Sequence, residues 1–509
     1  LAKKAEKYIP KDPELQELVP LVTAKLTILT DPPGADVYIR EYSDNEGEWK
    51  KLGRTPVNGA EVPGSSFFMT ASFYLVKIVK PGYEDVLAVT TTENDTLYRK
   101  IFMKGTIPPG MVYAEKYGDE VTNAGLKENS GFFIDRNEVT NKQFKKFVDN
   151  GGYGNPEYWK QKFIKNGKVL AREEAMAEFT DKTGRPGPST WEAGDYPEGD
   201  DNYPVTGVSW YEAAAYAEFA GKSLPTSNHW ASGAGFYLNL ISMGIRFNSK
   251  IVSISNVNGK GPEPVGKHFG VTAFGANDMA GNVREWVWNK TMVGHIIRGG
   301  AWDDAPYMYK FTSQLPSFDR SSKNGFRCVQ YIDKEKIPAT AFQRMDVREE
   351  NDFSQEKPVP ESTFRIYKNQ FLYDTTSLNA TIEKRDESPA DWIIEKISFN
   401  AAYGKERVIA YLYLPKNALP PYQTLIFFPG LGATWYKDLV NNNETKWDID
   451  YLLKSGRAVL FPVYKGTFER IDEPVVLDGH QYTEWLIKWV KDFRRSVDYL
   501  ETRPDINKS

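Results

Sequence analysis

Apolar and polar residues alternate along the first hundred positions, with the period of strands that bury one face. The stretches TAKLTILT and ADVYIREY, within residues 24–105, follow this pattern. Pro-Gly turns occur at DPPGA (Asp31 to Ala35) and KPGYE (Lys80 to Glu84). We therefore expect residues 24–105 to form a small β domain. Residues 1–23 are charged, helix-prone and interrupted by prolines, and we interpret them as a linker or the tail of an upstream domain.

The pattern changes over residues 108–332, where two helices are marked by capping boxes. TNKQ (Thr140 to Gln143) precedes QFKKFVDN, and SWYE (Ser209 to Glu212) precedes YEAAAYAEFA; glycines follow both. The remainder consists of short apolar runs between long loops rich in Gly, Trp and Asn. We expect little regular structure there.

The last part of the chain alternates strand and helix patterns. Residues 333–388 are polar with weak periodicity, which is typical of an interdomain linker. Over residues 389–509, RVIAYLYLP, TLIFFPG and AVLFPVY read as strands, and KWDIDYLLKSG and TEWLIKWVKDFRRSVDYLETR as helices. This alternation predicts an α/β domain with a mostly parallel sheet.

Composition narrows the class of protein. Of 509 residues, 40% are hydrophobic and 26% charged, which is typical of globular domains and not of a disordered chain. The net charge is −4 and no basic block occurs, so nucleic acid is not an expected partner. No apolar run approaches the length of a membrane span. The compartment stays open between the bacterial cytoplasm and the periplasm or cell surface.

Metal-binding side chains are sparse. The single cysteine, Cys328, cannot form an internal disulfide, and its strand-like setting in NGFRC predicts a small buried hydrophobe. The sequence contains four histidines, which lie far apart: His229, His268, His295 and His480. This spacing argues against a histidine-rich iron or zinc centre.

Five segments of residues 108–332 resemble the formylglycine-generating enzyme family, whose members are also called sulfatase-modifying factors. They are FFIDRNEVTNKQF, YPVTGVSWYEAAAYAEFAGKSLPT, FGANDMAGNVREWVWN, IIRGGAWDD and NGFRC, in the family's order. The resemblance implies an α+β fold of the C-type-lectin kind. Oxidases of the family that this sequence resembles bind copper through two cysteines, which follow the RGG-S/A-W motif.

Copper is not expected in this chain. By register from Gly300, the two copper positions fall on Asp304 and Tyr309, and no cysteine lies near them. Carboxylate and phenol oxygens do not hold Cu(I) as thiolates do. The sequence therefore resembles the scaffold of the family without its copper ligands, and we do not expect formylglycine-generating activity.

A structural calcium ion is implied by the same resemblance. In the family, the segment matching DMAGNVREW surrounds this ion. Carried over by position, Asp278 and Glu285 would bind it by carboxylate, and Gly281 and Val283 by backbone carbonyl. The alternative is a turn held by hydrogen bonds alone, with Glu285 capping amides.

A groove beside the copper positions is the candidate binding site. Its candidate residues combine aromatic rings with carboxylates: Trp302, Asp303, Asp304, Tyr307 and Tyr309. Such a combination suits an unknown ligand of the glycan or peptide type. The alternative is that the rings belong to the core and that the carboxylates cap loops.

The flanking regions resemble two further families. PPGADVYI, LGRTP and KPGYE resemble a PEGA-type β-sandwich module. GKERVIAYLYLPKN, TLIFFPGLGATW, GRAVLFPVYKG and DFRRSVDYLETRPDINKS resemble the first half of an α/β-hydrolase of the dienelactone hydrolase or acetyl-xylan esterase kind. This implies an oxyanion loop at Pro429 to Ala433, with the amides of Leu431 and Gly432 as donors; the alternative is a plain βα turn.

The fold class is therefore multidomain: a small PEGA-like β-sandwich, a C-type-lectin-like α+β domain and a truncated α/β-hydrolase. We expect a fragment of a multidomain bacterial protein in which the central domain is a ligand-binding or scaffolding module. One alternative is part of an esterase whose catalytic serine lies beyond Ser509, with a serine/threonine kinase domain upstream in cis. Another is a non-copper oxidase that uses the central domain.

Overall fold

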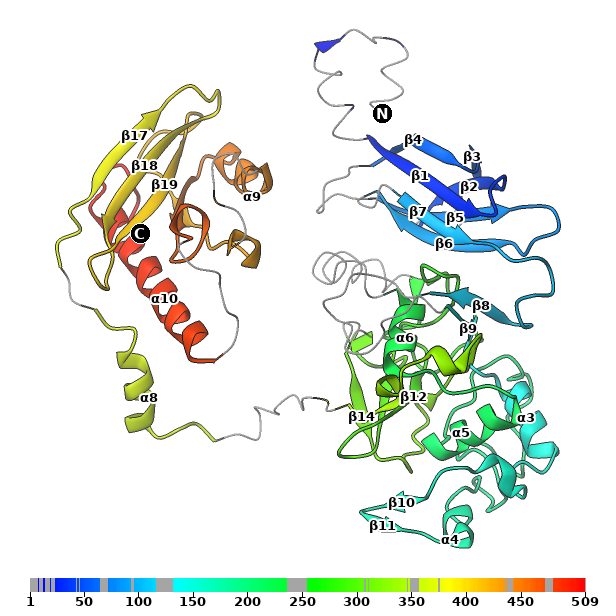
Figure 1. Cartoon of the computed structure of the whole chain (residues 1–509). Coiled ribbons are helices and arrows are strands. Elements are labelled where there is room, and N and C mark those ends of the chain that lie inside the picture. Colours follow the sequence, from blue (N-terminus) through cyan, green and yellow to red (C-terminus); the bar gives the residue numbers. More distant parts are fainter. Residues whose placement is uncertain are drawn as a thin grey trace. The chain divides into compact units, whose positions relative to one another are not determined.

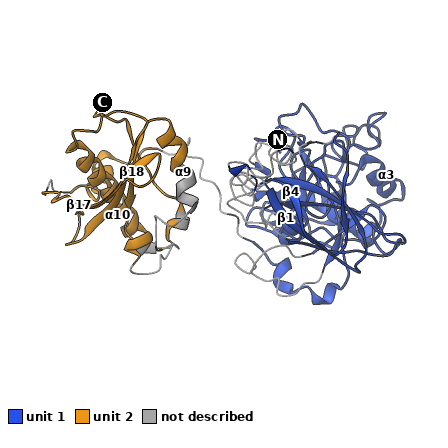
Figure 2. Cartoon of the chain, turned by 90° about the horizontal axis from the view of Figure 1, so that it is seen from above, with its two compact units in different colours: residues 1–350 blue, residues 351–509 orange. Residues whose placement is uncertain are grey.

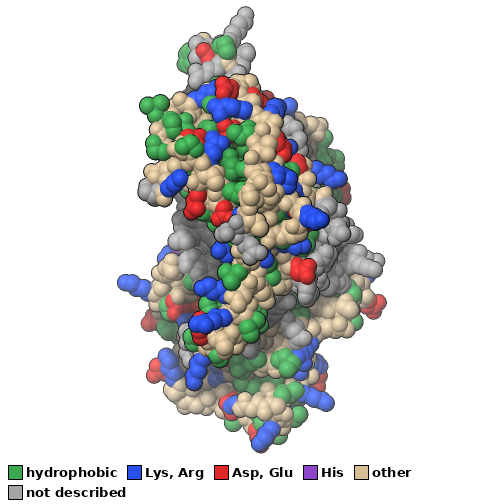
Figure 3. Space-filling view, turned by 90° about the vertical axis from the view of Figure 1, so that its left-hand side faces the viewer, with side chains coloured by type: hydrophobic (Ala, Val, Ile, Leu, Met, Phe, Trp, Pro, Cys, Tyr) green, Lys and Arg blue, Asp and Glu red, His purple; other side chains and the backbone are tan. Residues whose placement is uncertain are grey.

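A computed structural model gives the fold, and it divides into two compact units, Leu1–Glu350 and Asn351–Ser509 (Figure 2). It describes residues 8, 12–13, 19, 23–42, 44, 46–64, 72–92, 96–115, 131–235, 254–305, 308–309, 311–345, 347, 357–373, 376–434, 437, 443–471 and 479–508. Among these residues, no helix combines the length and the apolar character that crossing a membrane requires. On the face drawn in Figure 3, basic and acidic side chains are interspersed.

The first unit begins with two β-sheets (Figure 1). Their strands are β1 (Thr23–Asp31), β2 (Asp36–Glu41), β3 (Lys50–Arg54), β4 (Val57–Pro63), β5 (Phe73–Val79), β6 (Val86–Thr91) and β7 (Thr96–Lys100). The sheet orders are β4-β1-β7 and β3-β2-β5-β6. Burial alternates along β1, with Leu26 and Ile28 inside, and both sheets contribute side chains to one core. The alternation read from the sequence thus reflects one buried face on each sheet.

The central region carries many short elements joined by long loops. Its strands are β8 (Met111–Ala114), β9 (Phe132–Asp135), β10 (Ile164–Lys165), β11 (Lys168–Val169), β12 (Arg284–Lys290), β13 (His295–Arg298), β14 (Ser313–Leu315), β15 (Asn324–Gly325) and β16 (Val329–Tyr331). Its α-helices are α3 (Asn141–Asp149), α4 (Arg172–Met176), α5 (Trp210–Phe219) and α6 (Ser227–Ala234), and its 3-10 helices are η2 (Pro156–Tyr158), η4 (Lys334–Lys336) and η5 (Ala339–Phe342). The two larger sheets have the orders β14-β13-β12-β15 and β16-β9-β8.

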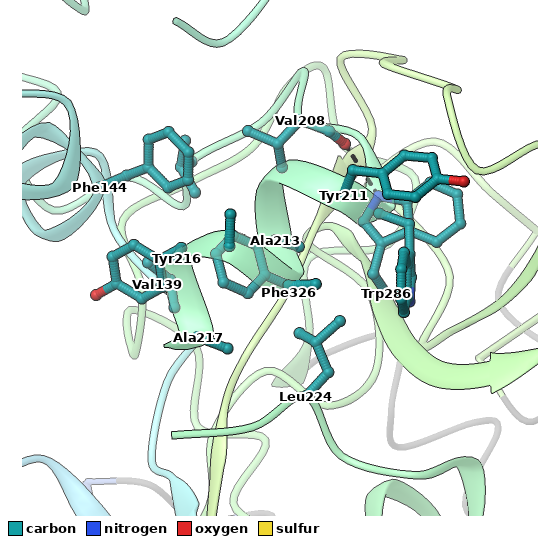
Figure 4. Close-up of a cluster of buried hydrophobic side chains, with 14 of the residues drawn as sticks. Val139, Phe144, Val208, Tyr211, Ala213, Tyr216, Ala217, Leu224, Trp286 and Phe326 are labelled. Atoms are coloured by element: carbon teal, nitrogen blue, oxygen red, sulfur yellow. Dashed lines mark hydrogen bonds between the residues drawn. The ribbon is translucent and has the colours of Figure 1, made fainter. Parts of the chain in front are cut away.

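Helix α5 is the centre of the aromatic core shown in Figure 4. Its residues Trp210 to Ala217 are all buried, and rings from α3, β12 and the strand region near residue 326 pack around it. Some buried polar groups of the rings bond to the backbone and others to side chains. The Trp286 indole, for example, donates to the carbonyl of Val208 at 2.9 Å. This core fixes β12, which carries the candidate site at its start.

The second unit is a five-stranded sheet between helices. Its elements are α8 (Glu361–Asn369), β17 (Thr381–Asp386), β18 (Trp392–Asn400), β19 (Arg407–Pro415), β20 (Thr424–Ile426), η6 (Leu431–Thr434), α9 (Asn443–Lys454), β21 (Ala458–Val463), η7 (Phe468–Arg470) and α10 (Gly479–Glu501). The order is β17-β18-β19-β21-β20. Helix α9 packs on one face through Ile449 and Leu453, and α10 on the other through Tyr499 and Leu500.

The described part of this sheet is mostly antiparallel, so the prediction of a mostly parallel sheet is wrong. Only β20 and β21 pair in parallel, whereas β17, β18, β19 and β21 pair antiparallel in succession. The reason is the connections: β18 and β19 are joined by a short turn, and only β20 reaches its parallel partner through a helix. Strand β17 lies within residues 333–388, the span interpreted as a linker, and pairs with β18.

Candidate functional site

The loop that follows β13 is held between two neighbouring segments. Gly299 and Gly300, with φ of 92° and 70°, turn the chain in a conformation that favours glycine. Beyond them, the amide of Trp302 donates to the carbonyl of Asn282 at 2.9 Å, and its carbonyl accepts from the amide of Gly259 at 2.6 Å. These backbone bonds fix the loop that carries Asp304 and Tyr309, the two positions that correspond to the copper cysteines of the resembled family.

Asp304, at the position of the first copper cysteine of the resembled family, is the acid of a bidentate ion pair. Arg284 Nε donates to its Oδ2 at 2.7 Å and Arg284 Nη2 to its Oδ1 at 2.6 Å. Oδ2 also accepts from the amide of Ala301 at 2.8 Å. Burial raises the pKa of Asp304, but the bonds and charge of Arg284 outweigh it, so this pKa lies below its usual value. Both carboxylate oxygens are therefore engaged in a charge-assisted pair.

The second copper position, Tyr309, is buried. Burial raises the pKa of its phenol to about 12, so the group is neutral at ordinary pH. Cys328 is also buried, and burial raises the pKa of its thiol well above the usual range. The prediction that Cys328 is buried is confirmed.

The remaining groove candidates lie around a lysine. Lys323 Nζ is 2.6 Å from Asp303 Oδ2 and 5.7 Å from the centroid of the Trp302 ring. Trp302 is half-buried, and its Nε1 has no hydrogen-bond partner among the described residues. Tyr307 lies outside the described residues. The structure thus brings Trp302, Asp303 and Asp304 to one loop, with both carboxylates already paired to cations.

A fully buried ion pair lies beneath this loop. Glu285 and Arg327, both without exposed side-chain surface, are joined by two bonds of 2.7 Å, from Nε to Oε2 and from Nη2 to Oε1. The indole of Trp230 donates a further bond of 2.6 Å to Oε2. Burial alone would lower the pKa of Arg327, but Glu285 raises it, so the guanidinium stays charged.

Arg327 also joins several segments of backbone. Its guanidinium donates to the carbonyls of Asp135 at 3.1 Å, Arg136 at 3.2 Å and Asn277 at 2.9 Å. One side chain therefore connects β9, the turn before β12 and β12 itself. All five donors of the guanidinium have acceptors.

Two further carboxylates surround this pair. Glu138 Oε1 accepts from Asn282 Nδ2 at 3.0 Å, whereas its Oε2 is buried without a hydrogen-bond partner in the described part of the chain. Asp278 Oδ2 accepts from the amide of Gly266 at 2.5 Å. Burial, and then the charge of Asp278, raise the pKa of Glu138. The cluster thus combines three acids with one arginine.

Comparisons with known proteins identify the central region. Residues 100–332 match the family described as "Sulfatase-modifying factor enzyme 1-like domain". This segment is a sulfatase-modifying factor enzyme 1-like domain. Three curated relatives share 28% identity: hercynine oxygenase of Mycolicibacterium smegmatis over 37% of this chain, formylglycine-generating enzyme of Mus musculus over 39%, and serine/threonine-protein kinase pkn1 of Chlamydia caviae over 40%. The matches span 50%, 66% and 33% of those proteins, respectively.

The calcium ligands predicted for the sulfatase-modifying factor enzyme 1-like domain fit its geometry only in part. Glu285 accepts three hydrogen bonds from Arg327 and Trp230, and an adjacent guanidinium disfavours a second cation there. Gly281 has a φ of 84°, and a Cβ there would lie 2.4 Å from the carbonyl oxygen of Asn256. The turn needs its glycine for this close approach. Among described residues, no three His, Cys, Asp or Glu side chains form a group that could hold a metal.

Sequence reasoning missed the partners that define this site. Arg284, Lys323 and Arg327 were not singled out, although each pairs with a predicted residue. Glu138 belongs to EVTN, a segment quoted only for its resemblance. In the second unit, the predicted oxyanion donors Leu431 and Gly432 lie in η6, and four residues separate η6 from the end of β20.

Proposed function

We propose that the sulfatase-modifying factor enzyme 1-like domain is a ligand-binding or scaffolding module of a multidomain bacterial protein and not a copper oxidase. The Arg284–Asp304 ion pair carries this proposal. It stands at the first position expected to hold a copper thiolate, and it gives the loop a cross-link built from hard oxygens and a guanidinium. Cu(I) prefers soft sulfur ligands. A buried neutral phenol at the second position supports the same conclusion.

Copper binding is the direct test. The full chain is titrated with Cu(I) against a chromophoric chelator and then incubated with a cysteine-containing peptide under oxygen. The formylglycine-generating enzyme of Mus musculus, a relative of this domain, serves as the positive control. We expect no stoichiometric copper and no aldehyde in the peptide. One tightly bound copper per chain, with conversion of the cysteine, would overturn the proposal.

A glycan is the ligand class that we favour for the groove. Asp303 and Asp304 are already neutralised by Lys323 and Arg284, which weakens their attraction for a basic peptide. The ring of Trp302, half-buried beside them, remains as a stacking surface for a sugar.

The test is a glycan array probed with the full chain and with Trp302→Ala. Met292→Ala, which removes an exposed apolar side chain of the same domain, is the control. We expect glycans retained by the wild type and by Met292→Ala, but not by Trp302→Ala. If the wild type retains no glycan, the binding role is refuted and the scaffolding role remains.

A structural calcium ion forms a second part of the proposal, with Glu138 in place of Glu285. Glu138 has a buried oxygen, Oε2, without a hydrogen-bond partner among the described residues. Burial, and then the charge of the neighbouring Asp278, raise the pKa of Glu138. With all three acids ionised, the cluster would carry two negative charges more than Arg327 offsets, and a divalent cation would balance them; without the cation, burial disfavours the ionised form of Glu138. Hard carboxylate and carbonyl oxygens are the ligands that calcium prefers.

Thermal unfolding with calcium or with a chelator tests this assignment. We expect calcium to raise the Tm of the wild type and of Glu173→Gln, a control at an exposed acid of α4, but not of Glu138→Gln. With chelator, Glu138→Gln should unfold at or above the wild-type Tm, because it removes a buried charge. A wild-type Tm that ignores millimolar calcium, or a calcium response that survives in Glu138→Gln, would rule the assignment out.

A kinase domain in cis is also proposed. It rests on the match to serine/threonine-protein kinase pkn1 of Chlamydia caviae, which covers 33% of that protein. Long-read sequencing of the native locus, followed by an autophosphorylation assay of the complete protein, tests it. A locus that encodes no kinase domain would remove this partner.

A further inference from the structure

Two backbone bonds hold Trp302 in the groove, and both lead to Asn282. The carbonyl of Asn282 accepts from the amide of Trp302 at 2.9 Å, which is a direct contact. The carbonyl of Trp302 accepts from the amide of Gly259 at 2.6 Å, and Gly259 belongs to the segment 256–263, which Asn282 also holds. The position of Trp302 therefore depends on the bonds of one buried residue.

The side chain of Asn282 is bonded to the segment 256–263 at three points. Its Oδ1 accepts from Asn256 Nδ2 at 3.0 Å and from the amide of Glu263 at 2.9 Å. Its Nδ2 donates to the carbonyl of Glu263 at 3.3 Å. The backbone amide of Asn282 also donates to the carbonyl of Asn256 at 2.9 Å. These bonds close the segment around one side chain and hold the amide of Gly259 where it meets Trp302.

The backbone of Asn282 adopts the left-handed conformation, with a φ of 59°. Asparagine is one of the few residues other than glycine that adopt it readily. In this conformation the carbonyl of Asn282 bonds to Trp302, while its side chain, in a residue only 1% exposed, bonds to groups behind the loop. Glycine is the substitution that keeps this backbone and removes the side chain.

The fourth side-chain bond of Asn282 reaches the acidic cluster around Arg327. Asn282 Nδ2 donates to Oε1 of Glu138 at 3.0 Å. The other oxygen of Glu138, Oε2, is buried and has no hydrogen-bond partner in the part of the chain that the structure describes. A cation bound at Oε2 would fix the carboxylate, and the carboxylate would fix the amide bonded to its other oxygen. Asn282 thus contacts both the proposed calcium site and the loop of the groove.

We propose that Asn282 is a positioning residue that couples a calcium ion at Glu138 to the placement of Trp302 in the groove. This inference rests on the calcium ion and the glycan-binding role proposed above, and it adds the link between them. Without the cation, Glu138 holds Asn282 less firmly, and Asn282 in turn holds both bonds of Trp302 less firmly. Coupling between two binding sites is reciprocal, so calcium and the groove ligand raise each other's affinity by the same factor.

Hydrogen exchange of the full chain tests the coupling with calcium or with a chelator, in the absence of a groove ligand. The peptides of interest contain the amides of Gly259 and Trp302, and the hairpin formed by β10 and β11 is the internal reference. We expect calcium to slow the exchange of both amides about fivefold or more in the wild type, because opening of the loop then also breaks the coupling. The hairpin should not respond, and Glu138→Gln should show no response at either amide.

Asn282→Gly separates the coupling from calcium binding. It removes the four side-chain bonds but leaves Glu138 and Asp278 in place. We expect calcium still to raise the Tm of this variant, but no longer to slow the exchange of the amides of Gly259 and Trp302.

Asn166→Gly is the matched control, because Asn166 has a similar φ of 50° and is exposed in the turn between β10 and β11. Its calcium response should equal that of the wild type. If Asn282→Gly does not fold, Asn256→Ala replaces it. Asn256→Ala removes one donor to Asn282 Oδ1, and calcium should then slow the exchange of Gly259 less than in the wild type. An unchanged response at Gly259 would contradict the coupling.

The outcomes separate the coupling from the two roles on which it rests. If calcium raises the wild-type Tm but leaves the exchange of both amides unchanged, the coupling is overturned and the calcium site stands. If calcium changes neither, both are overturned. If slowed exchange persists in Asn282→Gly, the role of Asn282 is overturned. A glycan retained on the array must bind more tightly in calcium than in chelator, and equal affinities would also overturn the coupling. An array without a retained glycan refutes the ligand class, and the exchange rates still decide the coupling.

Discussion

The buried cluster around Arg327 contains more acids than cations. We therefore expect substitution of Arg327 to destabilise the fold much more than substitution of Glu285. Three acids, Glu138, Asp278 and Glu285, face one guanidinium. Replacing Arg327 by Met removes the only cation that the cluster contains among described residues. Replacing Glu285 by Gln removes one of the three acids and keeps the side-chain shape. An isolated ion pair would instead lose the same interaction in both variants.

The magnitudes follow from the contacts. Breaking a buried ion pair costs about 3–5 kcal/mol. Arg327→Met also removes the donors to three buried carbonyls, those of Asp135, Arg136 and Asn277, at about 1 kcal/mol or more each. The sum approaches the whole stability of a domain, about 5–15 kcal/mol. For Glu285→Gln we expect about 1–2 kcal/mol, because the amide oxygen still accepts from Trp230 or Arg327 and the other acids still face the guanidinium.

The measurement is urea unfolding of the full chain, monitored by tryptophan fluorescence. Arg327→Lys is included because it keeps the charge but cannot make the two-pronged bond. We expect Arg327→Met to unfold without denaturant, Arg327→Lys to be intermediate and Glu285→Gln to stay close to the wild type. Equal losses in Arg327→Met and Glu285→Gln would refute the view that the cluster is one unit of excess negative charge.

Two further predictions concern the close approach of Gly275 to Leu87 and the pH dependence of stability. In thermal unfolding, Gly275→Ala should destabilise the first unit by about 1–3 kcal/mol more than Gly82→Ala. Both glycines have similar positive φ, but only at Gly275 would a Cβ collide with a backbone carbonyl, that of Leu87. Equal losses would mean that the backbone around Gly275 shifts to accept the Cβ. Burial lowers the pKa of His295 from 6.5 to about 3 while its ring stacks on Trp210 at 3.6 Å. The neutral form stabilises the fold above pH 6.5, and this contribution is lost by about 1.4 kcal/mol per pH unit as the pH falls towards 3. His295→Phe keeps the stacking and should flatten the slope of stability between pH 6.5 and 4.5; an unchanged slope would contradict the role given to this histidine.

Local features of the fold were predictable from the sequence. Capping boxes at Thr140 and Ser209 are confirmed at the starts of α3 and α5. A cap depends on residues within one helical turn, so the sequence contains all of the information. The same holds for the strands of the first sheets, where alternation alone identifies the buried face.

Long-range pairings were not predictable from the sequence. Arg284 and Asp304 lie 20 residues apart, and Glu285 and Arg327 lie 42 apart. Each acid was seen as a candidate ligand, because a carboxylate without a visible partner suggests metal or substrate binding. Glu138 gave no signal at all, since its role depends on Asn282, 144 residues away. The predicted direction of the strands in the second unit was wrong for the same reason. Periodicity shows that a strand exists, but not which strand lies beside it.

The two ion pairs of the site explain how the loop after β13 and the strands around it are held together. The Glu285–Arg327 pair is part of the fold, since its guanidinium joins β9, β12 and the turn between them. The Arg284–Asp304 pair lies nearer the surface and joins β12 to the loop after β13. A metal bound at that loop would restrain it, and the ion pair restrains it by charge-assisted bonds instead. A loop held in this way would present Trp302 in a fixed orientation to the ligand proposed for the groove.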